Sequence, residues 1–123
     1  MWLAHNQDNQ NKIRGIILEN TFTSISDLID NFAPLGSILK PFIQKLFWPS
    51  IDRIPKIETP ILFVRGLKDE LIPSWHTQSL IKAAKSSKYI KVFECANGDH
   101  NHCFLFGKDK YYQSFHNFFE KCE

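Results

Sequence analysis

Several features that would point to a particular function are missing from this chain of 123 residues. It has only five glycines, at positions 15, 36, 66, 98 and 107, and no two of them are four residues apart. These residues therefore contain no Gly-x-Ser-x-Gly motif, which places a nucleophilic serine on a sharp turn between a strand and a helix. The charge is also nearly balanced, with 15 basic and 13 acidic residues scattered along the chain. Such a distribution lacks the basic patch of a nucleic-acid-binding protein, and we expect no nucleic-acid partner.

Cysteines and long apolar runs are scarce as well. Cys95, Cys103 and Cys122 are odd in number and do not form a Cys-x-x-Cys pair. We expect three free thiols, which favours an intracellular, reducing environment. No apolar run approaches the ~18 residues needed to cross a bilayer. Residues 1–12 are polar and do not have the pattern of a signal peptide, so nothing in these residues predicts export or anchoring.

The composition predicts a folded domain. Hydrophobic residues make up 43% of the chain and aromatic residues 14%, including eleven phenylalanines. That content argues against disorder, and the length is that of one ordinary domain or of part of one. No linker, repeat or low-complexity tract divides the chain.

Three apolar runs predict three strands, at residues 15–20, 60–66 and 89–94. The first is dense in β-branched residues, as expected of a strand buried on both faces of a parallel sheet. The second is opened by a proline and closed by a glycine. The third alternates between apolar and polar residues, which suits a strand nearer an edge.

Helical patterns fill the space between and after these strands. Ser74 is a candidate N-cap for a helix over residues 74–86, whose apolar stripe includes Leu80 and Ile81. With its two flanking strands it predicts a right-handed βαβ unit. Residues 108–121 carry aromatic side chains at helical spacing and predict a closing helix packed on the sheet.

The segment between the first two strands predicts a helical excursion over residues 24–50. Residues 24–31 and 38–47 favour two helices, broken at the Pro-Leu-Gly sequence of residues 34–36. Phe42, Phe47 and Trp48 suggest a cap-like insertion that covers a pocket. The predicted fold class is therefore α/β, with three parallel strands, flanking helices and a small helical cap-like insertion.

An acid and a histidine follow two of the predicted strands. Asp69 comes after the second strand and His100 after the third, and one helix and one strand fill the 31 residues between them. Ligands bind at the carboxyl ends of the strands in such sheets. A catalytic triad needs a histidine that takes a proton and a carboxylate that fixes its tautomer. The order acid then histidine, with a serine upstream, is that of α/β hydrolases.

Other readings of these residues stay open. An aspartate three residues beyond a strand, such as Asp69, is often only a turn or capping residue. His5, His76 and His116 have no acidic or nucleophilic partner that the sequence reveals, and we expect them to be structural. Three serines lack the context of a nucleophile on a sharp turn and sit where helix caps are expected: Ser24, Ser26 and Ser37.

A metal site is a further alternative. Asp99, His100, His102 and Cys103 lie close together in the sequence. Adjacent ligands on one loop rarely supply the three or four convergent positions that zinc needs, so we expect no metal and no cofactor. His102 is then a solvated neighbour or a pocket-wall residue. Cys103 is too near His100 along the chain to serve as its nucleophile.

Three segments together resemble a known family. They are GIILENTFTSI (residues 15–25), GLKDELIP (66–73) and GDHN (98–101). From about residue 13 to 119 the chain resembles the family of alpha/beta-hydrolase domain-containing protein 13. That family consists of serine hydrolases of the α/β fold, grouped by sequence with serine aminopeptidases.

The resemblance implies roles for several residues. It makes Asp69 the triad acid and His100 the general base. Residues 19–22 then mark the strand that follows the nucleophile helix, and residues 1–11 the end of that helix. Asp99 stands where the family commonly has a small residue, and His102 where an acidic residue is usual. These two departures bear on the polarity of the pocket and leave Asp69 and His100 intact.

By this resemblance, residues 1–123 are a single partial domain, the C-terminal part of an α/β-hydrolase fold. The expected function is the C-terminal segment of a serine hydrolase that cleaves ester, thioester or amide bonds of a small-molecule, lipid or peptide acyl substrate. The early strands, the oxyanion-hole loop and the serine would precede Met1, so we expect this chain alone to be inactive. The alternative is a non-catalytic binding or assembly module that associates through an exposed strand edge.

Overall fold

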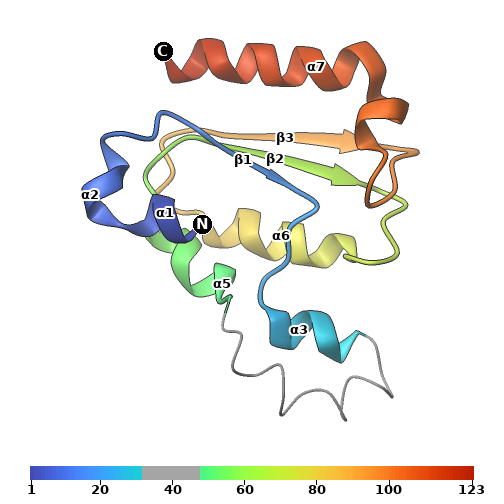
Figure 1. The fold of residues 1–123 in the computed structure, drawn as a ribbon, viewed down its shortest axis with the longest axis horizontal. Coiled ribbons are helices and arrows are strands. Elements are labelled where there is room, and N and C mark those ends of the chain that lie inside the picture. The colour runs from blue at the N-terminus through green and yellow to red at the C-terminus, as the bar shows by residue number, and fades with distance from the viewer. Residues whose placement is uncertain (32–47) are drawn as a thin grey trace.

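The computed structural model describes residues 1–31 and 48–123 (Figure 1). The predicted helix over residues 38–47, with the preceding break, lies outside the described residues, as do Ser37, Phe42 and Phe47. The described elements, in chain order, are α1 (Trp2–His5), α2 (Gln7–Gln10), β1 (Ile16–Glu19), α3 (Ile25–Asp30), α5 (Ser50–Arg53), the 3-10 helix η1 (Ile54–Lys56), β2 (Ile61–Gly66), α6 (Ser74–Ala83), β3 (Ile90–Cys95) and α7 (Cys103–Cys122).

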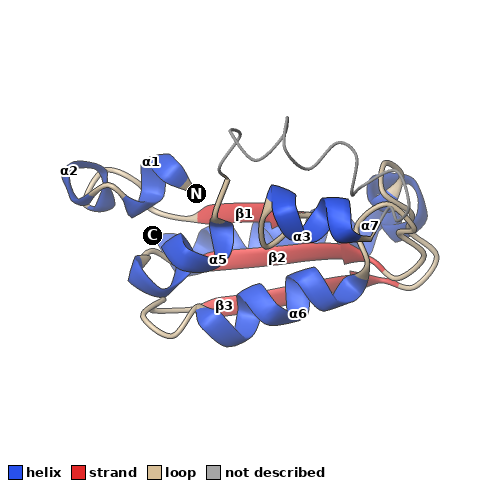
Figure 2. Ribbon diagram, turned by 90° about the horizontal axis from the view of Figure 1, so that it is seen from below, coloured by secondary structure: helices blue, strands red, loops and turns tan. Residues whose placement is uncertain are grey.

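The three strands form one parallel sheet in the order β1-β2-β3. In the register Ile16 lies opposite Ile61, and Ile61 opposite Ile90. Figures 1 and 2 show α7 on one face of the sheet and α3, α5 and α6 on the other. This confirms the predicted three parallel strands with flanking helices.

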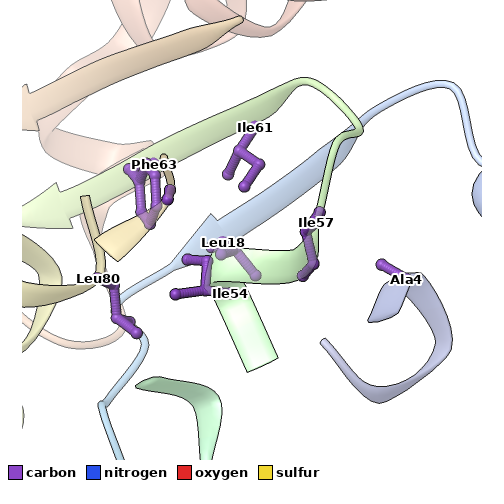
Figure 3. Packing of buried hydrophobic residues seen from close by; sticks show 8 residues of the cluster. Ala4, Leu18, Ile54, Ile57, Ile61, Phe63 and Leu80 are labelled. Carbon is purple, nitrogen blue, oxygen red and sulfur yellow. The ribbon is translucent and has the colours of Figure 1, made fainter. Parts of the chain in front are cut away.

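Strand β2 is the centre of the core. Its residues 61–64 have no exposed surface. Alternate side chains of a strand point to opposite faces, so two of the four pack in a cluster with Leu80 of α6, shown in Figure 3. The other two pack in a second cluster with Phe118 of α7. A continuous apolar run is buried in full here because helices cover both faces of the strand.

The two outer strands are more exposed. The alternation predicted for β3 is seen only from Val92 on, where exposed and less exposed residues follow one another, and Val92 itself is an exposed apolar residue. The first strand packs on both faces as predicted, since Ile16 contacts one core cluster and Ile17 the other, but its burial is less complete than predicted: Leu18 is buried, while Ile16 and Ile17 are partly exposed. The reason is that, among the described strands, β1 pairs with β2 alone.

Three predicted helices need correction. Pro73 is the N-cap of α6 and Ser74 its first residue, without a side-chain cap, and the helix ends at Ala83 rather than near residue 86. α7 begins at Cys103, five residues before the predicted start, and Lys108 marks a break in its helical geometry, with φ 45° and ψ −132°. Residues 1–11 hold two short helices instead of the end of one. The predicted capping role of Ser24 is confirmed, since its hydroxyl accepts the N–H of Asp27 at 3.0 Å.

His76 joins α3 to α6 in a buried network. Its Nε2 lies 2.9 Å from the side-chain nitrogen of Asn31, and its Nδ1 lies 2.9 Å from Oγ1 of Thr23. Nδ1 also accepts the backbone N–H of Thr23 at 3.3 Å. The Thr23 hydroxyl in turn donates to Asp27 at 2.6 Å. Burial lowers the pKa of His76, and the negative charge of Asp27 opposes that shift in part.

The lowered pKa of His76 predicts an acid-sensitive stability. Below the ordinary histidine pKa of about 6.5, the unfolded chain binds a proton that the folded chain does not, so the free energy of unfolding falls as the pH falls. We expect urea unfolding between about pH 7 and about pH 5 to show this loss in the wild type, and a smaller loss in His76→Gln. The matched control is His116→Gln on the exposed side of α7, which should keep the wild-type dependence. Equal pH dependence in wild type and His76→Gln would refute this role of His76.

Candidate active site

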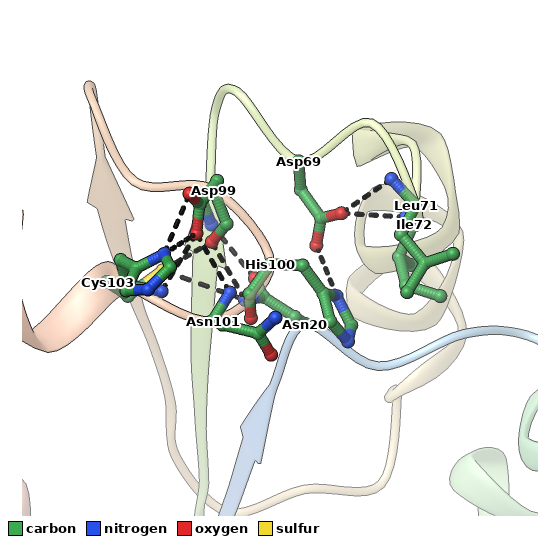
Figure 4. Close-up of polar contacts among 10 residues, drawn as sticks. Asn20, Asp69, Leu71, Ile72, Asp99, His100, Asn101 and Cys103 are labelled. Atoms are coloured by element: carbon green, nitrogen blue, oxygen red, sulfur yellow. Dashed lines mark hydrogen bonds and ion pairs between the residues drawn. The ribbon is translucent and has the colours of Figure 1, made fainter.

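The predicted acid and histidine lie together at the carboxyl end of the sheet. Asp69 is in the loop after β2, and His100 is in the loop after β3 (Figures 1 and 4). Parallel neighbouring strands end at the same edge, and the loops that leave them converge there. Nδ1 of His100 is 2.9 Å from Oδ2 of Asp69.

The carboxylate of Asp69 is held in a fixed orientation. Its second oxygen, Oδ1, accepts the backbone N–H groups of Leu71 at 2.9 Å and Ile72 at 2.8 Å. The Asp69 side chain is only 2% exposed. Asp69 therefore does cap a turn, through Oδ1, while its other oxygen, Oδ2, contacts His100.

The imidazole of His100 is open to solvent on its other side. Its side chain is 32% exposed. Figure 4 shows the second ring nitrogen pointing away from Asp69. In the neutral ring, a proton donated from Nδ1 to the carboxylate leaves Nε2 as the free acceptor. This tautomer is the one that a general base requires.

A close backbone approach sets the separation of the two loops. The N–H of Leu67 donates to Cys95 O at 2.9 Å, and the N–H of Lys68 donates to Gly98 O at 2.9 Å. A Cβ atom on Gly66 would overlap the carbonyl oxygen of Gly98 and would come within 2.7 Å of that of Asp99. Glycine is needed at position 66 because the two backbones touch there.

Asn20, just beyond β1, contacts both loops and was not singled out as a site residue from the sequence. Its amide nitrogen donates to His100 O at 2.7 Å, and its amide oxygen accepts the N–H of Gly66 at 2.9 Å. The residue is 7% exposed and has a positive φ of 42°. An asparagine directly after a strand was the feature of the sequence that could have indicated this role, because asparagine tolerates a positive φ better than most residues.

The neighbouring acid and histidine form a separate, exposed pair. Nδ1 of His102 lies 2.8 Å from Asp99, and hydrogen bonds from His102 and from the backbone N–H of Asn101 lower the pKa of the Asp99 carboxyl. His100 and His102 are thus bound to different carboxylates. Over residues 1–31 and 48–123, no group of three or more histidine, cysteine, aspartate or glutamate side chains is placed to hold a metal ion.

The cysteines are free thiols. Cys103 is fully buried beside Cys95 and behind the histidine loop, and its Sγ lies 3.5 Å from Asp99 O. Burial raises the pKa of the Cys103 thiol to about 11. It therefore stays protonated at neutral pH, which makes it a poor nucleophile. The reducing environment inferred from these cysteines stays a prediction.

The remaining histidines lie outside the site. His76 is in the buried network between α3 and α6. The expectation that His116 has no acidic partner is wrong, because its Nε2 lies 3.4 Å from Glu120, one turn along the exposed side of α7. Such i,i+4 pairs on a helix surface contribute only a few tenths of a kcal/mol.

A shallow pocket of about 460 Å³ adjoins the site and is lined by Lys68, Glu70, Leu71, Asp99, His100 and Asn101. A larger hollow of about 750 Å³ lies at the opposite end of the sheet, next to Trp2 and Glu58, far from the acid and the histidine. No helix in the described part of the chain has the length and apolar character needed to cross a membrane.

The chain is similar in sequence to known proteins. It is 35% identical to the alpha/beta hydrolase domain-containing protein WAV2 of Arabidopsis thaliana in an alignment of 127 positions. The alignment covers 94% of this chain and 41% of that protein. The chain is 47% identical over 73 residues to protein bem46 of Schizosaccharomyces pombe, which covers 58% of this chain and 24% of that protein. The chain therefore spans less than half the length of these relatives. No protein-family model matches it.

Solved structures share its fold. The acylaminoacyl peptidase of Pyrococcus horikoshii superposes with a TM-score of 0.73 at 21% identity, over 97% of this chain and 21% of that one. The esterase Pf2001 of Pyrococcus furiosus superposes with a TM-score of 0.68 at 14% identity, over 93% of this chain and 48% of that one.

Three parallel strands, helices on both faces and these superpositions define the C-terminal part of an α/β-hydrolase fold. With the sequence similarity to WAV2 and bem46, the chain belongs to the α/β-hydrolase family.

The contact at Gly66 predicts a strong dependence of stability on that position. A methyl group there pushes the histidine loop away from β2, and overpacking of this kind costs about 1–3 kcal/mol. We expect Gly66→Ala to lower the urea midpoint of unfolding accordingly. Leu67→Ala is the matched control, because Leu67 is 47% exposed and its truncation should change stability by about 0.5 kcal/mol or less. Equal midpoints for the two variants would contradict the close approach.

Proposed function

We propose that this chain supplies the acid and the histidine of a serine-hydrolase triad, with Asp69 as the acid and His100 as the general base. The observation that carries this proposal is the 2.9 Å contact between His100 Nδ1 and a buried carboxylate whose other oxygen is already held by two backbone N–H groups. The nucleophilic serine is contributed by chain outside these 123 residues, because they contain no Gly-x-Ser-x-Gly motif.

The geometry suits a proton shuttle. Nε2 of His100 accepts the hydroxyl proton of the serine as the serine oxygen attacks the acyl carbon. The resulting imidazolium is stabilised by the negative charge of Asp69, which stays ionised. His100 then gives the proton to the leaving group, and a water molecule, deprotonated in the same way, releases the acyl group from the serine.

The proposed reaction class is hydrolysis of an ester, thioester or amide bond in a small-molecule, lipid or peptide acyl substrate. The two structural neighbours, an esterase and an acylaminoacyl peptidase, support acyl transfer to water as the general chemistry. Next to His100 this chain offers a pocket wall with one apolar member, Leu71. The fold itself does not select among the acyl substrates.

The proposal predicts that both residues are needed for hydrolysis. In the longer protein that joins this chain to an upstream segment with the serine motif, we expect Asp69→Asn to lower kcat for p-nitrophenyl esters by about 10⁴-fold, because the histidine adopts the wrong tautomer. His100→Ala removes the base, and we expect a loss of about 10⁶-fold.

Two matched controls lie on α7, outside the site. Asp109→Asn and His116→Ala make the same chemical changes at exposed positions and should leave kcat within about twofold. Folding of each variant is checked by circular dichroism. Wild-type rates in folded Asp69→Asn or His100→Ala would end the proposal.

One observation favours a second candidate, a non-catalytic binding or assembly module. Among the described strands β1 pairs with β2 alone, so its outer edge presents unpaired backbone groups. Such edges template association with another strand. The N–H of Ile16 bonds to β2, so by alternation the N–H of Ile17 points to the open edge.

This alternative predicts self-association of the 123-residue chain. Light scattering should show dimers or larger species, and Ile17→Pro, which removes the outward N–H, should shift them toward monomer. Ile90→Val on the far strand is a conservative control that should leave the distribution of species unchanged. A wild-type chain that is folded by circular dichroism, monomeric and without a partner would exclude the module.

A further inference from the structure

Asn20 connects the main chain of Gly66, where the acid loop begins, to that of the proposed base with a single side chain. Its amide nitrogen donates to His100 O at 2.7 Å and approaches Asp99 O at 3.4 Å. Its amide oxygen accepts the N–H of Gly66 at 2.9 Å, and Gly66 O in turn accepts the N–H of Asp69 at 3.3 Å. The acid loop and the histidine loop are thus both tied to the end of β1. Figure 4 shows Asn20 beside the histidine loop.

The backbone of Asn20 aims the side chain at the two loops. Its N–H donates to Val64 O at 2.9 Å, which completes the pairing of β1 with β2. Its positive φ of 42° then turns the chain away from the strand direction. Asparagine adopts this conformation with little strain, whereas most residues with a Cβ do not.

The chemistry of the contact requires an amide. The oxygen end faces a donor, the N–H of Gly66. The nitrogen end faces three acceptors, the carbonyls of Asp99 and His100 and, at 3.7 Å, the sulfur of Cys103. An aspartate has the same shape but only acceptor oxygens, so one of them would face two carbonyl oxygens. Asn20 is also 7% exposed, and an unmatched charge there gains little from water.

We propose that Asn20 is a positioning residue that holds His100 at hydrogen-bond distance from Asp69 by fixing the main chain of the histidine loop. This inference rests on the proposed function, because it assigns Asn20 to the triad acid and base. Asn20 acts through His100 and Gly66 and contacts no reacting atom itself. A displacement of about 1 Å in such a site lowers the rate by up to 10²-fold.

The test uses the longer protein with its serine segment and the variant Asn20→Asp. We expect kcat to fall by about 10–100-fold while KM stays within about twofold, because the base is misplaced and the substrate-binding surface is not. We expect nuclear magnetic resonance to detect the Nδ1 proton of His100 in the wild type, and this signal should be lost in the variant. Asn9→Asp is the matched control, since Asn9 also donates from its amide to a backbone carbonyl, that of Leu3, on the far N-terminal segment.

Asn20→Gly keeps the positive φ and removes the bridge, so it decides the matter if Asn20→Asp does not fold. We expect it to lower kcat by about tenfold without the charge clash. A kcat within twofold of the wild type in the folded variant, or an unchanged Nδ1 proton signal, would overturn the inference. If Asp69→Asn and His100→Ala retain activity while Asn20→Asp still loses the Nδ1 proton, then Asn20 positions the pair and the hydrolase proposal alone fails.

Discussion

The contact of two backbones at the carboxyl end of the sheet determines the site. The histidine loop rests on the end of β2 without a side chain between them, at Gly66 and Gly98. That contact brings Asp69 and His100 within 2.9 Å of each other, although 31 residues separate them. Because main-chain hydrogen bonds set the separation of the two loops, the short side chains of Asp69 and His100 are close enough to contact each other.

The rest of the fold supports this contact in layers. Helices bury both faces of β2, with Leu80 on one side and Phe118 on the other. α7 begins directly after the histidine loop, and the buried Cys103 in its first turn fills the space behind that loop. Tyr111, also on α7, donates to Glu19 at the end of β1, so the same helix binds both outer strands at the carboxyl edge.

The sequence was informative where a pattern has a single physical solution. A fully apolar run such as residues 61–64 has to be buried on both faces, and the chain order of Asp69 and His100 placed both at one edge of a parallel sheet. The sequence was less informative where contacts between distant segments determine the role of a residue. The partners of His76 and Asn20 come from segments more than 40 residues away, and no local pattern encodes them. The open edge of β1 was expected from the resemblance to a partial fold, but the partial exposure of Ile16 and Ile17 was not, because a β-branched run looks the same at an edge and at the centre of a sheet.

If Asp69 and His100 complete a serine triad, the serine has to lie next to Nε2 of His100. A structure of the longer protein that contains this chain gives the distance from that nitrogen to the nearest serine hydroxyl. We expect a serine Oγ on a strand-to-helix turn within about 2.6–3.2 Å of it, or slightly more in the absence of substrate. A structure in which Nε2 of His100 faces no serine hydroxyl, with the contact to Asp69 intact, would contradict the triad.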